Sequence, residues 1–138
     1  MNEKEGLKLN SIGANFVLAP DGSEIRLLQE ANLGGLSECT LTIDGISSAV
    51  CHQTVEEIWF FTQGIGQVWR RMENTDQIDD VRPGVSLLIP LGVHFQFRNT
   101  GTIPLSSSSP PCHLGPVPTR HVLLMANGIR NRRLVFER

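Results

Sequence analysis

The chain has 138 residues, 40% of them hydrophobic, and a formal net charge of -2 at pH 7. This length fits one domain with a core of ordinary size, and the near-neutral charge gives no general attraction to nucleic acid or to an acidic surface. No apolar run approaches the roughly 18 residues of a membrane-spanning helix, and the start of the chain lacks the apolar core of a secretory signal, so we expect a cytoplasmic protein with no membrane partner.

Cysteine usage narrows the chemistry further. Cys39, Cys51 and Cys112 form no Cys-x-x-Cys pair, so neither a disulfide framework nor a structural zinc site is indicated. Free thiols fit a reducing compartment. For Cys51 a small buried thiol is the favoured interpretation and a nucleophile the less favoured one, because no Cys-His-Asn arrangement is legible around it.

Short apolar segments dominate the chain after a polar lead-in at residues 1–15. The predicted strands, in chain order, are 16–19, 24–28, 36–43, 57–62, 66–71, 85–90 and 94–99. Pro, Gly, Asn or Asp stands at most of the breaks, and the run 72–80 is interpreted as a polar connection. Short strands at about 8–12-residue spacing with turn residues between them are typical of an all-β sandwich or barrel.

The alternation of side chains along a strand assigns faces to two of these segments. In strand 57–62, Glu57, Trp59 and Phe61 share one face, and the opposite face is also apolar, so we expect this strand to be covered on both sides. Trp59, Phe61 and, on another strand, Trp69 are candidates for contact with a ring-shaped ligand, although such aromatic residues are more often simply core.

The strand 94–99 has one polar face. His94, Gln96 and Arg98 alternate with two phenylalanines and an asparagine, so the three polar side chains lie together. A polar face on an otherwise apolar strand is suited to line a pocket, and Arg98 would then pair with an anionic ligand.

These segments resemble the cupin family, a small double-stranded β-helix, or jelly-roll barrel, with two motifs facing each other across it. EIWFFTQG (residues 57–64) fits the end of the first motif, and GVSLLIPLG (residues 84–92) fits the start of the second. Asn99 falls at the last place of the second motif. The resemblance implies a single-domain all-β cupin barrel over residues 16–109.

The resemblance also implies a metal site, with changes. Cupins that bind Fe, Mn, Ni, Zn or Cu use two histidines and the glutamate of the first motif and the histidine of the second. Here only His52 fits a first-motif histidine place, when four residues separate that place from Glu57; with three, the two places fall on Cys51 and Gln53. The second-motif place falls on Phe95, one past His94. If a β-bulge or a tighter turn resets the strand register so that both histidines face the pocket, His52, Glu57 and His94 form a two-histidine, one-carboxylate site. Gln96 would then be a weak fourth ligand.

Three interpretations of the pocket follow. In the first, a divalent transition metal with open positions supports an oxygenase, isomerase or lyase acting on a small organic molecule. In the second, no metal binds, and a small apolar or anionic ligand is held by Trp59, Phe61, Gln96 and Arg98. In the third, side chains fill the pocket, or the protein has lost an earlier enzymatic activity because its C-terminal residues differ from those of other cupins. The fold hosts many chemistries, so whether the protein is an enzyme stays open.

The resemblance stops after Leu105, where four serines stand in place of the apolar alternation of a barrel-closing strand, so we expect a poor final strand here. In cupins with motifs such as HRTVEEIW and PTGTHFQFR, that segment is apolar and MPPWPG follows it. The genetic code allows a DNA sequence that encodes residues 105–130 and also encodes MPPWPG in a second reading frame. That second frame starts at the third base of the Leu105 codon. We interpret the tail, residues 110–138, as the product of a single-base deletion near codon 105.

Partners are predicted from the same tail. Asn127-Gly128 separates two apolar segments and predicts a β-hairpin on the sheet edge or on a partner subunit. Small cupins are commonly homodimers, so we expect a homodimer and a small-molecule ligand. Five arginines between residues 120 and 138 would suit nucleic acid, but the frame shift explains them, so nucleic acid is the less favoured partner.

Overall fold

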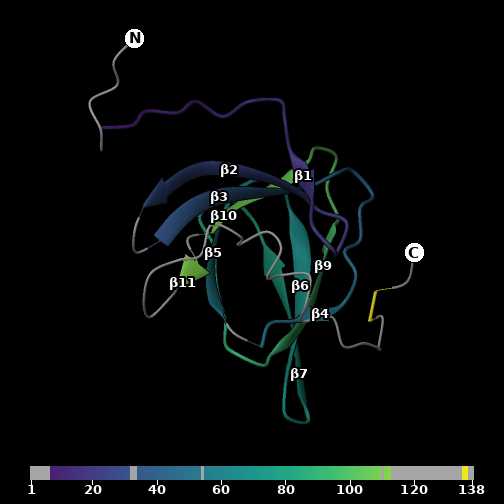
Figure 1. Cartoon of the computed structure of the whole chain (residues 1–138). Helices are drawn as coiled ribbons and strands as arrows, with labels where there is room; N and C mark the ends of the chain where they lie inside the picture. Colours follow the sequence, from purple (N-terminus) through teal and green to yellow (C-terminus); the bar gives the residue numbers. More distant parts are fainter. Residues whose placement is uncertain (1–6, 32–33, 54, 110, 113–134, 137–138) are drawn as a thin grey trace.

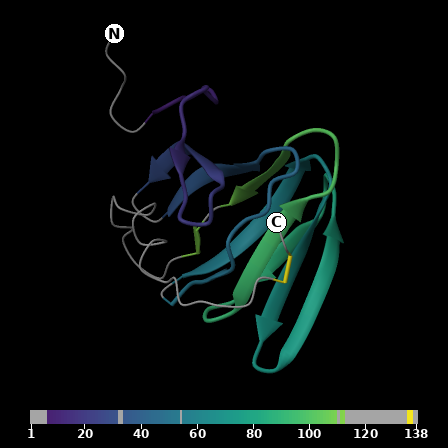
Figure 2. The ribbon, with the colours of Figure 1, turned by 90° about the vertical axis from the view of Figure 1, so that its right-hand side faces the viewer.

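The computed structural model describes residues 7–31, 34–53, 55–109, 111–112 and 135–136, and every regular element in these ranges is a β-strand. The prediction of an all-β fold is confirmed. Within the described ranges, no helix has the length and hydropathy to cross a bilayer. Two antiparallel sheets face each other, as Figure 1 shows from one side and Figure 2 after a quarter turn.

The larger sheet follows the order β1-β2-β3-β10-β5-β11, and β8 pairs with β5 beside this path. Its strands are β1 (Val17–Leu18), β2 (Glu24–Ala31), β3 (Gly34–Leu41), β5 (Glu56–Gln63), β8 (Ser86–Ile89), β10 (Leu105–Ser109) and β11 (Pro111–Cys112). The smaller sheet has the order β4-β9-β6-β7. Its strands are β4 (Val50–Cys51), β6 (Gly66–Met72), β7 (Thr75–Val81) and β9 (His94–Asn99).

The interior between the sheets is apolar, with Trp59 of β5 near its centre. The indole meets the rings of Phe61, Phe95 and Phe97 edge-on, at centroid distances of 6.2, 5.3 and 5.1 Å. Aromatic rings prefer this geometry because the positive edge of one ring meets the negative face of the next. The other buried members of this cluster are Leu41, Val50, Val68, Val81, Leu87, Ile89, Val93 and Leu105.

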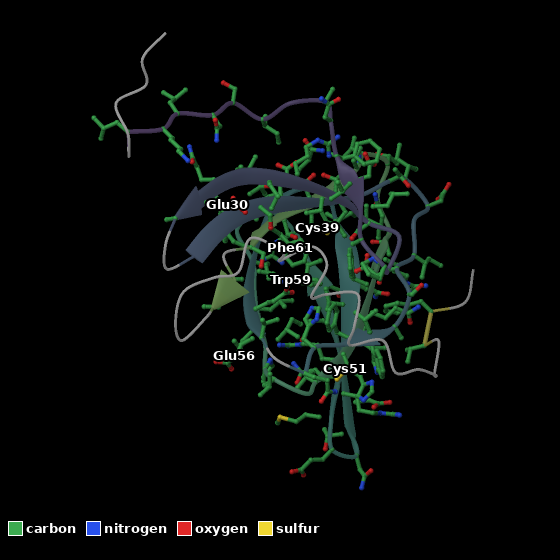
Figure 3. All side chains as sticks on the ribbon, in the orientation of Figure 1. Glu30, Cys39, Cys51, Glu56, Trp59 and Phe61 are labelled. Atoms are coloured by element: carbon green, nitrogen blue, oxygen red, sulfur yellow. The ribbon has the colours of Figure 1, made fainter. Side chains whose placement is uncertain are left out.

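The strand β5 is covered on one face. Glu57, Trp59 and Phe61 share one face, as the alternation predicts, and this face points inward with each side chain at most 5% exposed. Figure 3 shows Trp59 and Phe61 in the interior below Cys39. Ile58 and Phe60 on the outer face are 43% and 46% exposed, so the prediction that both faces are covered is wrong. In a two-sheet fold the core lies on a single side of each sheet.

Motif glycines occupy turns that other residues would strain. Gly64 has a φ of 80°, and a Cβ added there would lie 2.6 Å from the carbonyl oxygen of Pro104. Gly84 has a φ of 91°. Left-handed φ values carry no steric cost for glycine, so these two motif positions are set by backbone geometry.

The prediction that residues 72–80 form a polar connection is wrong, because β7 runs through them. This strand lies at the edge of the smaller sheet and pairs with β6 along its length. Its polar side chains bind across the pair: Arg70 donates to Asp79 at 2.6 Å, and Gln67 donates to Asp80 at 3.0 Å. Such cross-strand pairs support an exposed edge strand that has little apolar surface.

The strand β10 forms although four of its five residues are serines. It lies between β3 and β5 and pairs with both, with a register shift between Ser106 and Ser107. A central position satisfies the backbone groups on both edges whatever the side chains are, so the expectation of a poor strand here is wrong. The predicted hairpin around Asn127-Gly128 lies outside the described residues.

Candidate ligand pocket

A pocket opens between the two sheets, and about 460 Å³ of empty space, open solvent included, lies within it and at its mouth. The turn between β1 and β2 and the strands β2, β3, β5 and β10 form one side, and β4, β9 and the residue after β4 form the other. Its apolar walls include Ile25, Val50, Trp59 and Phe95. The ionisable side chains among its described lining residues are Asp21, Cys39, His52 and Glu57.

His52 and Glu57 lie together at the polar end of this pocket. Glu57 is 2% exposed, and its Oε2 accepts a hydrogen bond of 2.7 Å from the indole Nε1 of Trp59. The Nε2 atom of His52 lies 3.5 Å from Oε1 of Glu57. That nitrogen is buried and makes no hydrogen bond within the described part of the chain. Trp59 therefore fixes the carboxylate, while Nε2 of the neighbouring imidazole has no hydrogen bond within the described residues.

The carboxyl group of Asp21 also lines the pocket. It sits in the turn before β2, where its Oδ1 accepts hydrogen bonds from the backbone N and the Oγ of Ser23, at 2.9 and 2.6 Å. Burial raises the pKa of Asp21, against the lowering effect of these two bonds, and the charge of Glu57 raises it further. Sequence reasoning missed this residue, because Pro20-Asp21-Gly22 is a turn signal by itself and only the packing of the turn brings it to the pocket.

Cys39 and Cys51 are unsuited to nucleophilic chemistry. Burial raises the pKa of the Cys39 thiol far above its ordinary value, and the nearby Asp21 adds to the effect. Burial also raises the pKa of Cys51, whose sulfur accepts a hydrogen bond of 3.2 Å from Gln53. Since the thiolate is the nucleophile, both residues are held in the unreactive form, and Cys51 is a buried thiol at 2% exposure.

His94 lies on the face of β9 that points away from the pocket. The tighter turn that would bring it inward is not formed: β9 pairs with β4 so that Phe95 opposes Val50 and His94 opposes Cys51. Val50 and Phe95 line the pocket, and Phe95 also packs on His52 at a centroid distance of 5.2 Å. Burying the two phenylalanines of β9 removes much more apolar surface from water than burying His94 would.

Gln96 shares that outward direction, yet it is fully buried. Its Nε2 donates to the carbonyl oxygen of Ser47 at 2.9 Å. Its Oε1 accepts from the backbone N atoms of Val135 and Phe136 at 2.9 and 3.0 Å. The side chain that was a candidate metal and pocket ligand thus holds residues 135–136 against the outer face of β9.

Arg98 takes part in the same contact. Its guanidinium group stacks on the ring of Phe136 at 4.4 Å from the centroid, and its Nε donates to Oε1 of Gln67 at 3.0 Å. Of the four predicted ligand-pocket residues, the structure therefore brings Trp59 to the pocket wall and leaves Phe61 in the core beside it.

Within the described ranges, the side chains do not assemble a three-ligand metal centre. His52 and Glu57 supply two donors, and among the residues that the structure describes no group of three or more His, Cys, Asp or Glu side chains is placed to hold a metal ion. His94, the expected third metal ligand, could join His52 and Glu57 only if it lay on the face of β9 that points into the pocket.

Two facing antiparallel sheets around an inner pocket define the cupin double-stranded β-helix, and solved structures confirm this fold. The Drosophila melanogaster CENP-C cupin domain has a TM-score of 0.62 at 13% identity, over 69% of this chain and 72% of that one. The protein BH2720 of Bacillus halodurans has a TM-score of 0.58 at 22% identity, over 69% of this chain and 74% of that one.

A predicted oxalate decarboxylase of Thermotoga maritima has a TM-score of 0.57 at 18% identity, over 67% of this chain and 81% of that one. No family model matches the sequence, and no curated protein does. At these identities the likeness establishes the fold alone. One fold that serves a CENP-C domain and a protein named as a decarboxylase does not assign an activity.

Proposed function

We propose that this chain is a small-molecule-binding cupin that holds its ligand in the pocket between the sheets without a metal. His52 and Glu57 form the polar end, and Trp59 and Phe95 form the apolar wall. One observation carries the proposal: Nε2 of His52 is buried and makes no hydrogen bond within the described residues, 3.5 Å from a carboxylate that Trp59 holds in place. An unsatisfied buried polar group costs about 1–3 kcal/mol, and a ligand hydrogen bond there would offset that cost.

The second proposal is a metal-dependent enzyme of the oxygenase, isomerase or lyase type. Its support is the approach of His52 and Glu57 to 3.5 Å, since imidazole and carboxylate are the donors that Fe, Mn, Ni, Zn and Cu accept. It requires His94 to move to the inner face. By its name, the Thermotoga neighbour is a predicted oxalate decarboxylase; oxalate is a dianion, and the described lining residues of this pocket include no Lys or Arg.

A titration with benzyl alcohol tests the first proposal. The chain has two tryptophans, so the indole N–H signals in a ¹H–¹⁵N spectrum report separately on the pocket and on the rest of the fold. We expect the signal of Trp59 to shift saturably, while that of Trp69, which does not line the pocket, stays in place. The loss of this shift in His52→Phe would support the assignment, and a shift equal at both tryptophans would contradict it.

Elemental analysis of the purified protein separates the two proposals. We expect a transition-metal content far below one ion per chain. One ion per chain, lost in both His52→Ala and Glu57→Gln, would replace the first proposal by the second.

We further propose that the chain belongs to the cupin subgroup with HRTVEEIW-like and MPPWPG-like motifs, and that a single-base deletion near codon 105 produced its tail. The support is the back-translated MPPWPG, together with serines at inward positions of β10 such as Ser107, which is 3% exposed. The nucleotide sequence decides it: codons that cannot encode MPPWPG one base earlier would rule out the deletion. A homodimer also stays a prediction of the resemblance.

A further inference from the structure

The pocket of the proposed function has a pronounced charge imbalance. Two carboxyl groups, Asp21 and Glu57, line it together with His52, and its described lining residues include no lysine or arginine. Arg98, the cation predicted to face a ligand, stacks on Phe136 outside the barrel. Buried carboxylates are ordinarily paired with a cation or with several hydrogen-bond donors, because an isolated charge is costly away from water.

The hydrogen bonds inside the protein satisfy these groups in part. Glu57 receives the indole N–H of Trp59, and Asp21 receives the backbone N and the hydroxyl of Ser23. All of these donors are neutral. Burial, the largest cause, and the neighbouring charge of Glu57 raise the pKa of Asp21, while the two bonds from Ser23 and the nearby His52 lower it without cancelling the rise.

His52 provides a separate indication of a ligand. The side chain is 5% exposed, lines the pocket, and has an Nε2 atom without a hydrogen-bond partner in the part of the chain that the structure describes. This nitrogen lies 3.5 Å from Oε1 of Glu57, and a neutral imidazole with its proton on Nδ1 offers it as an acceptor, so that a ligand donor can bind both atoms. The pocket thus presents three acceptor groups at its polar end and aromatic and aliphatic walls beyond them.

Resting on the proposed function, we propose that the pocket selects a small primary amine, with its ammonium group against Asp21, Glu57 and His52 and an apolar body against Trp59, Phe95 and Val50. An ammonium group has three N–H donors and one positive charge, so it matches both the number of acceptors and the sign of the missing charge. A ligand of the same shape with a carboxylate in place of the ammonium group would bring a further negative charge next to Asp21 and Glu57. The pocket would therefore reject it.

Three probes of nearly equal shape test the selection: benzylamine, benzyl alcohol and benzoate, titrated at pH 7 and constant ionic strength into the full ¹⁵N-labelled chain with EDTA present. The Trp59 indole signal reports binding, and the Trp69 signal reports the state of the fold. Because a charge-assisted hydrogen bond is stronger than a neutral one, we expect benzylamine to bind about tenfold more tightly than benzyl alcohol, and benzoate to bind more weakly than both.

Matched variants assign the effect to Asp21. Asp21→Asn keeps an acceptor oxygen for Ser23 and removes the charge; we expect it to weaken benzylamine binding about tenfold and to leave benzyl alcohol binding within about twofold. Asp44→Asn removes the same charge from an exposed turn outside the pocket, and we expect it to change neither.

The outcomes separate the two proposals. Benzoate binding as tightly as benzylamine, or benzylamine binding unchanged in Asp21→Asn, would overturn the amine selection and leave the pocket as a binding site. The absence of a Trp59 shift with all three probes would overturn the binding function and the selection with it.

Discussion

Replacing Gln96 by alanine is expected to lower the free energy of unfolding by about 3 kcal/mol. The variant loses the hydrogen bond to the carbonyl of Ser47 and the two bonds from the backbone of Val135 and Phe136. These groups then lie buried without a partner, or residues 135–136 leave β9 and expose Phe136, which is 4% exposed in the native fold. Either response removes stabilisation, because unpaired buried groups and exposed rings both cost free energy.

Two measurements check this expectation. Urea unfolding gives the loss of stability, and amide hydrogen exchange shows whether the N–H groups of Val135 and Phe136 lose their protection. Gln77→Ala on the exposed strand β7 is the matched control, with an expected change within about 0.5 kcal/mol. Unchanged exchange at both amides in Gln96→Ala would show that Gln96 does not hold this segment.

Replacing Trp59 by phenylalanine is expected to cost about 3 kcal/mol of stability. The smaller ring leaves a gap among Phe61, Phe95 and Phe97, and it removes the N–H that binds the buried carboxylate of Glu57. In the background Glu57→Met no carboxylate is left to satisfy, so there the same replacement is expected to cost only about 1 kcal/mol, the part due to packing.

A double-mutant cycle with Trp59→Phe and Glu57→Met, measured by denaturant unfolding, gives the coupling between the two side chains directly. Trp69→Phe is the control, because the Nε1 of Trp69 has no hydrogen-bond partner in the described residues and the residue does not contact the carboxylate. We expect its cost to be independent of Glu57. A coupling near zero for the Trp59 pair would mean that the indole does not stabilise the carboxylate.

Both predictions concern residues whose roles depend on which face of a strand is inward. For Trp59 and Glu57 the sequence pattern showed only that they share a face of β5, and the packing of the two sheets turned that face inward. For Gln96 the pattern shows only that it shares a face with His94 and Arg98. The direction of that face follows from the pairing of β9 with β4 and β6, which join residues far apart in the chain.

Two elements show how neighbours override local preference. The serines of β10 have weak strand preference, and the strand forms because β3 and β5 both offer unpaired edges to it. The polar residues of β7 contain no apolar alternation, and the strand forms as an edge that β6 supports through ion pairs and a backbone ladder. Neither environment is visible in a window of a few residues.

The amino-acid sequence by itself determined the all-β class and the positions of most strands, because turn residues and alternation act over a few residues. It also identified Glu57 and Gly64 as the first-motif glutamate and glycine, since the distance between them depends only on one strand and the turn that ends it. The tertiary structure alone decided that Phe95 faces the pocket in place of His94, that Gln96 holds residues 135–136, and that Asp21 joins His52. Each of these depends on the register between distant strands, where a shift of one residue reverses every face.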